Sequence, residues 1–189
     1  MDYSSDLTEK AVIGIIINSY SSCYSNLIHN SKKDSFDFES SDKTHCLEVT
    51  TILPINVINA MEYEKSLIKN KIANKNKVFD AKYNDSGELL YYHGGDLSEL
   101  RYLVLRSISV KTIKAIKRIK KNKMNIKSLE LALYVDDGGI IDSKKDIQYI
   151  LYSEEFANSI LTKIFYIGRS TFFVIEKNKI TEFTRKVKG

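Results

Sequence analysis

Residues 35–53, Ser-Phe-Asp-Phe-Glu-Ser-Ser-Asp-Lys-Thr-His-Cys-Leu-Glu-Val-Thr-Thr-Ile-Leu, contain the pattern that decides the fold. Apolar and polar residues alternate from Ser35 to Glu39, which is typical of a short strand with one buried face. The run from Cys46 to Leu53 is richer in apolar and β-branched residues, so it predicts a more buried strand. Pro54 follows directly and ends this strand, because proline has no N–H to give to a sheet.

Outward from this stretch, predicted helices and strands alternate along the chain. We expect helices over residues 8–24, 55–73, 96–124 and 145–162, and further strands over residues 129–135, 164–167 and 172–175. Asn84-Asp85-Ser86-Gly87 has turn composition between two strand-like arms, which predicts a β-hairpin over about residues 78–92. Strands separated by helices predict an α/β protein with a mixed sheet of four to five strands flanked by helices.

The length and composition indicate one domain over residues 1–189, with the hairpin as an insertion. A chain of 189 residues with 43% hydrophobic residues can bury one sizeable core, and it has no repeat and no linker rich in proline or glycine. No window approaches the roughly 18 uninterrupted apolar residues of a membrane span. The start, Met1 to Asp6, is acidic where a secretion signal needs basic residues, so we expect a cytoplasmic protein without a membrane partner.

Charge is distributed unevenly along the chain. Residues 1–64 hold four basic and ten acidic residues, whereas residues 65–127 hold sixteen basic and five acidic ones. Such a basic segment predicts binding to a polyanion such as nucleic acid, with a solvated helix face as the open alternative. The densest part of the segment falls on the predicted helix over residues 96–124, and its candidate nucleic-acid-binding residues are Lys111, Lys114, Lys117, Arg118, Lys120, Lys121 and Lys123.

Acidic residues on the two neighbouring strands are the first candidates for chemistry. Asp37 and Glu48 can project from the same part of a sheet, and like charges placed close together favour a cation between them. Carboxylates of this kind suit Mg²⁺ or Mn²⁺, and Glu9 on the first predicted helix is a candidate third ligand. The alternative is that Asp37 and Glu48 are ordinary half-exposed strand residues.

The runs Phe36-Asp37-Phe38 and Leu47-Glu48-Val49-Thr50 resemble the core motif of the PD-(D/E)XK nuclease-like superfamily. That motif places an Asp and an acidic-x-Lys pattern on adjacent strands, after a helix that often carries a Glu. The later order of a Lys-rich helix, a strand end with acidic turn residues at 131–137, a helix and the run at residues 163–167 is similar to bacterial members of the superfamily. The resemblance implies a restriction-endonuclease-like fold and metal-dependent hydrolysis of nucleic-acid phosphodiester bonds.

Position by position, the resemblance implies that Asp37 and Glu48 are catalytic acids and, with Glu9, ligands of Mg²⁺ or Mn²⁺. Thr50 stands where the family has a lysine, which orients the attacking water and stabilises charge on the phosphate. Some members take this lysine from a neighbouring helix. Lys65 is the candidate named here for that role, and Lys69, Lys120 and Lys123 are its alternatives.

Three functions are consistent with these features. The first is a Mg²⁺-dependent nuclease, acting on DNA in preference to RNA. The second is a nucleic-acid-binding module on the same fold without catalysis, which the absence of lysine at Thr50 suggests. The third is a protein-interaction subunit of a defence or mobile-element system, which the charge asymmetry suggests. A homodimer and a complex with a protein partner both remain open.

Overall fold

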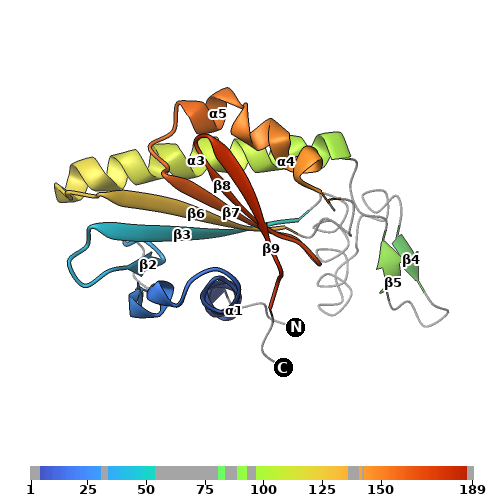
Figure 1. Ribbon diagram of the computed structural model, residues 1–189, viewed down its shortest axis with the longest axis horizontal. Coiled ribbons are helices and arrows are strands. Elements are labelled where there is room, and N and C mark those ends of the chain that lie inside the picture. The colour runs from blue at the N-terminus through green and yellow to red at the C-terminus, as the bar shows by residue number, and fades with distance from the viewer. Residues whose placement is uncertain are drawn as a thin grey trace, which may run out of the picture.

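The computed structural model describes residues 5–30, 34–53, 81–83, 89–92, 97–135, 141 and 143–186. Within these residues, seven strands form one mixed sheet in the order β1-β2-β3-β6-β7-β8-β9 (Figure 1). β3, β6 and β7 are parallel, and the remaining neighbours pair antiparallel. The bounds are β1 Ile28–His29, β2 Phe38–Glu39, β3 His45–Ile52, β6 Ser128–Val135, β7 Lys163–Ile167, β8 Phe172–Glu176 and β9 Lys179–Phe183.

Helices cover both faces of this sheet (Figure 1). α1, Ser5–Ser19, lies on one face and continues into the short 3-10 helix η1, Ser22–Asn26. The other face carries α3, Leu97–Asn122, together with α4, Lys144–Leu151, and α5, Glu154–Ala157. Parallel neighbours need a crossover connection, and α3 lies between β3 and β6 in the chain while α4 and α5 lie between β6 and β7. The predicted α/β class, with a mixed sheet flanked by helices, is confirmed.

Alternation along the strands divides the interior into two apolar layers. Leu131 and Leu133 of β6 pack under α3, where they meet Val104 and Ile108. On the other face, a second set packs under α1: Val12, Ile16, Leu47, Ala132, Phe165 and Phe172. β6 is buried on both sides, as expected for a central strand between two helical layers.

The sheet has more strands than the four to five that the sequence predicts. β1 is only two residues long, too short for a periodic pattern to reveal, and of the strand expected over residues 35–39 only Phe38–Glu39 forms, as β2. β9 is a half-exposed edge strand that pairs with β8 from Phe172 opposite Phe183 to Glu176 opposite Lys179. Its sequence, Lys-Ile-Thr-Glu-Phe, has a weak apolar pattern, so pairing with β8 decides its conformation.

Two predicted helices are shorter than their patterns suggest. The helix expected over residues 8–24 ends at Ser19, and Tyr24 turns inward from η1 to reach a buried carboxylate. The helix expected over residues 145–162 is divided into α4 and α5 by Ser153. The Ser153 hydroxyl accepts a hydrogen bond from the Phe156 N–H, so it caps a new helix where the apolar pattern alone continues.

The structure describes only part of the predicted hairpin and none of the helix predicted after β3. β4, Ala81–Tyr83, and β5, Leu89–Tyr92, pair antiparallel inside the predicted hairpin range of residues 78–92. The helix predicted over residues 55–73, with Lys65 and Lys69, lies outside the described residues. Among the described helices, none is long and apolar enough to cross a membrane.

Candidate functional site

Two acidic and two basic side chains lie close together between β2, β3 and α3. Glu48 points from β3 toward α3 and is almost completely buried, with 5% of its surface exposed. The Lys111 ammonium donates to Glu48 Oε2 at 2.7 Å, and the Arg118 guanidinium donates to Glu48 Oε1. Lys111 and Arg118 are seven residues apart on α3, which places them on one side of the helix. The candidate site is therefore a buried carboxylate held by two cations from one helix.

Asp37 joins this site from the residue before β2. Its Oδ2 atom accepts a hydrogen bond of 2.7 Å from the Val49 N–H, and it lies 3.9 Å from Lys111 Nζ. Lys111 also donates to the Val49 carbonyl oxygen at 2.9 Å. The lysine is thus fixed at three points, two of them on β3, and it lies between the two carboxylates that the sequence singles out.

Burial raises the pKa of the Asp37 carboxyl group. Desolvation is the largest cause and the Glu48 charge the second, and together they raise the pKa of Asp37 to about 6. The Val49 N–H and the Lys111 charge act in the opposite direction but do not offset burial. Asp37 is therefore a carboxylate near neutral pH and a neutral acid below about pH 6.

The third predicted ligand, Glu9, is not joined to the other two by a shared contact. Glu9 Oε2 lies 2.8 Å from His29 Nε2, and its charge is the last of the causes that raise the Asp37 pKa. Within the described part of the chain, no three His, Cys, Asp or Glu side chains are arranged to hold a metal ion. Mg²⁺ binds through one or two carboxylates plus water and phosphate, so a donor set of Asp37 and Glu48 is of the kind that would suit this metal, with Glu9 left outside it.

Thr50, the residue at the family lysine position, follows Glu48 by two residues on β3. Side chains two residues apart lie on the same face of a strand, so Thr50 also faces α3, where it is half-buried. The structure brings a lysine to Glu48 from α3 instead. That lysine is Lys111, which the sequence pattern places among the candidate nucleic-acid-binding residues and not with the acids.

The predicted basic cluster of α3 divides into two sets. Lys111 and Arg118 are half-buried and paired with Glu48, so they are less accessible than the rest of the cluster. The rest of the cluster is exposed, and Lys121 Nζ lies 2.8 Å from Asp34 Oδ2 at the surface. The exposed set consists of Lys114, Lys117, Lys120, Lys121 and Lys123.

The sequence contains a pattern that indicates that Lys111 and Arg118 face the interior. Ile108, Lys111, Ala115 and Arg118 follow one another at spacings of three and four residues, and Ile108 and Ala115 belong to the core. Two cations at the edge of an apolar helix stripe need buried partners. The structure supplies Glu48 as that partner.

A second polar cluster lies on the opposite face of the sheet, under α1. Glu130 of β6 is 3% exposed, and it accepts a hydrogen bond of 2.8 Å from the Tyr24 hydroxyl. His45 Nε2 and Lys163 Nζ lie 3.1 and 3.5 Å from the same carboxylate. Burial alone would raise the pKa of Glu130, but His45, Lys163 and Tyr24 outweigh it and hold that pKa below its ordinary value. His45 thus lies on the face opposite Glu48, as the strand alternation predicts.

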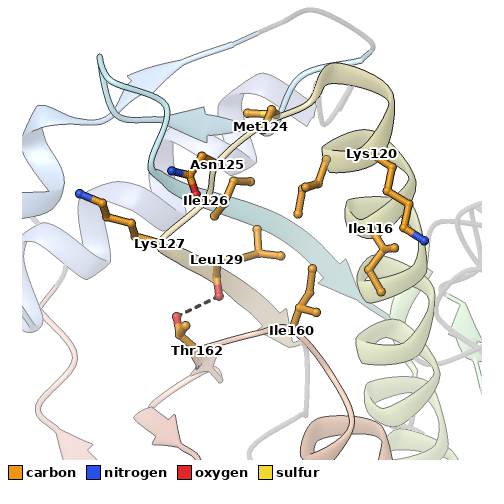
Figure 2. A pocket seen from close by; sticks show the side chains of 10 residues that line it. Ile116, Lys120, Met124, Asn125, Ile126, Lys127, Leu129, Ile160 and Thr162 are labelled. Carbon is orange, nitrogen blue, oxygen red and sulfur yellow. Dashed lines mark hydrogen bonds between the residues drawn. The ribbon is translucent and has the colours of Figure 1, made fainter.

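An apolar groove of about 370 Å³ lies between the end of α3 and the segment that leads to β7 (Figure 2). Ile116, Ile126, Leu129 and Ile160 point into it, while the Lys120 ammonium points away (Figure 2). The Thr162 hydroxyl closes one side with a hydrogen bond of 3.0 Å to the Leu129 carbonyl oxygen. The lining contains no carboxylate, so this groove offers Mg²⁺ no acidic ligand.

Comparison with known proteins adds no assignment to either cluster, because the chain matches no protein-family model and no curated protein. The contacts among Asp37, Glu48 and Lys111 are therefore the features on which a function can be argued.

Proposed function

We propose that this protein is a Mg²⁺-dependent nuclease that hydrolyses phosphodiester bonds in nucleic acid. Asp37 and Glu48 would hold the metal, and Lys111 would take the role that the family motif gives to the lysine two residues after the Glu. One observation carries the proposal: Lys111 Nζ lies 2.7 Å from Glu48 Oε2 and 3.9 Å from Asp37 Oδ2, although it comes from α3. The restriction-endonuclease-like fold is part of the proposal, supported by Glu48 on β3 and by Asp37 directly before the neighbouring strand β2.

The residues present can supply the charges that phosphodiester hydrolysis needs. Mg²⁺, when bound, polarises a phosphoryl oxygen and neutralises developing charge. Lys111 is fixed by Val49 and Glu48, so its ammonium is already oriented when a phosphate arrives. Glu48 is buried, which strengthens its interaction with any cation beside it. The exposed lysines of α3 would bind phosphates on either side of the cleaved bond.

A second candidate function is a nucleic-acid-binding module without catalysis. The observation that favours it is that both Glu48 oxygens already contact cations, Lys111 on one and Arg118 on the other. Paired charges of this kind also occur as purely structural networks. In that case the exposed lysines of α3 would bind phosphates without any metal.

The deciding experiment is cleavage of labelled single- and double-stranded DNA and RNA in Mg²⁺, Mn²⁺ or EDTA. We expect metal-dependent cleavage, with DNA preferred, and a loss of about 100-fold or more in Glu48→Gln and in Lys111→Gln. Lys10→Gln removes an exposed charge from α1, on the other face of the sheet, and should cleave like the natural protein.

Each other outcome has a defined meaning. Cleavage that survives in folded Glu48→Gln protein would rule out this site as the catalytic centre. Binding of nucleic acid without cleavage in any metal would favour the second candidate. Binding to neither DNA nor RNA at low salt would leave a protein-interaction role.

A further inference from the structure

We propose that Arg118 couples metal binding to substrate binding. In the free protein its guanidinium occupies one oxygen of Glu48, and a phosphate of nucleic acid draws it away, so nucleic acid and Mg²⁺ bind cooperatively. The inference rests on the proposed function, and it concerns a positioning residue outside the motif described above.

The two cations on Glu48 are held unequally. Lys111 has two further anchors, the Val49 carbonyl oxygen at 2.9 Å and Asp37 Oδ2 at 3.9 Å. Arg118 contacts Glu48 Oε1, and its guanidinium carbon lies 4.7 Å from the centre of the Phe36 ring. That second contact is a cation–π interaction, which is weaker than a charged hydrogen bond to a fixed backbone oxygen. Arg118 is therefore the cation that can leave at the lower cost.

The charge of the cluster requires one cation to leave before a divalent ion enters. Asp37 and Glu48 bring two formal negative charges, and Lys111 and Arg118 bring two formal positive ones within ion-pair distance of them. A divalent ion added to this balanced set would meet two cations around a carboxylate that is 5% exposed, where repulsion is poorly screened. Removal of Arg118 leaves a net negative site with a free Glu48 oxygen.

A phosphate near α3 can draw Arg118 out. Lys114 and Lys121 precede and follow Arg118 by four and three residues, which makes them its neighbours on the helix surface, and both are exposed. A phosphate bound by either lysine is therefore close to Arg118. Guanidinium binds phosphate through two parallel hydrogen bonds, so this pairing can replace the contact with Glu48.

The test is a Mn²⁺ titration followed by electron paramagnetic resonance, with and without phosphorothioate DNA that resists cleavage. In the natural protein we expect the DNA to tighten Mn²⁺ binding about tenfold, and Mn²⁺ to tighten DNA binding by the same factor. In Arg118→Gln we expect Mn²⁺ to bind about tenfold more tightly without DNA, and the coupling to fall below about twofold. Arg106→Gln is the matched control, since Arg106 is an exposed arginine of the same helix.

The inference is overturned if the Mn²⁺ affinity of the natural protein is independent of DNA. This measurement needs no variant, so it is decisive even if Arg118→Gln does not fold. It is also overturned if folded Arg118→Gln binds Mn²⁺ less tightly or keeps the full coupling. Coupled binding without cleavage would reject the nuclease and keep the inference. Cleavage together with Mn²⁺ binding that needs Glu48 but is independent of DNA would keep the nuclease and reject the inference. If no Mn²⁺ binds through Glu48, both the nuclease and the inference are rejected.

Discussion

Asp37 shows how burial changes a single residue. Its pKa is raised to about 6 from an ordinary 3.8, with desolvation first and Glu48 second among the causes. Between these two values the folded protein keeps the proton that the unfolded chain has released. The folded state therefore binds more protons there, and the contribution of Asp37 to the free energy of unfolding falls as pH rises from about 4 to above 6.

Asp37→Asn removes this titration but keeps an oxygen that can accept from the Val49 N–H. We expect the free energy of unfolding of Asp37→Asn, minus that of the natural protein, to rise by about 1 kcal/mol between pH 5 and 7. Urea denaturation in EDTA measures it. Asp42→Asn is the control, because the pKa of exposed Asp42 is lowered to about 2 by hydrogen bonds from Ser40 and Thr44, so its titration ends below this range. A constant difference for Asp37→Asn would show that Asp37 has an ordinary pKa.

At the scale of elements, α3 has two different charged surfaces. Lys111 and Arg118 face β3 and are bound to Glu48, whereas Lys117 and Lys120 face solvent. The same residue types thus have two roles, because helical periodicity turns one set toward the sheet and the other away from it. Under either of the two proposed nucleic-acid functions, we expect the exposed set to contribute most of the affinity for phosphates.

Charge reversal of the exposed set tests this assignment. We expect Lys117→Glu with Lys120→Glu to weaken DNA binding about tenfold or more, and to reduce the slope of log affinity against log salt concentration by about 2. The control is Lys10→Glu with Lys179→Glu, which makes the same change of charge at exposed positions on α1 and β9. Fluorescence anisotropy over a salt series measures both proteins. Equal slopes in the two proteins would place the nucleic-acid surface elsewhere.

At the scale of the whole molecule, one sheet separates two apolar layers. Ile108 of α3 belongs to one layer and Ile16 of α1 to the other, and both are completely buried. β3, β6, β7 and β8 contribute side chains to both layers, so loss of either layer removes support from the same strands. The two layers should therefore unfold together.

Large-to-small substitutions in each layer test this cooperativity. We expect Ile108→Ala and Ile16→Ala each to lower the free energy of unfolding by about 2–5 kcal/mol, through lost burial and a new cavity. Ile113→Ala is the control on α3, where a side chain that is 54% exposed should change stability by about 0.5 kcal/mol or less. Far-ultraviolet circular dichroism and tyrosine fluorescence should give coincident urea transitions in all variants. Separate transitions would mean that the layers fold independently.

The α/β class could be predicted from the sequence, because the strong signals are local. The apolar runs at residues 46–53 and 129–135 and the long amphipathic pattern at residues 96–124 correspond to β3, β6 and α3. Periodicity is a property of neighbouring residues, so these elements can be predicted without knowing what they pack against. The two-residue strand β1 and the edge strand β9 could not, since their pairing partners decide their conformation, and the alternation over residues 35–39 located β2 but not its length of two residues.

The candidate site was predictable only in its acids. Asp37 and Glu48 could be singled out from their strands, and Thr50 indicated that a cation must come from elsewhere in the chain. Which cation it is depends on the rotation of α3 and on its position over β3, which place Lys111 at Glu48, 63 residues away in the sequence. The sequence by itself determined the elements and the acidic residues, through local periodicity and composition. The tertiary structure alone decided which charges meet, because a buried carboxylate takes whichever cations the packing brings within hydrogen-bonding distance.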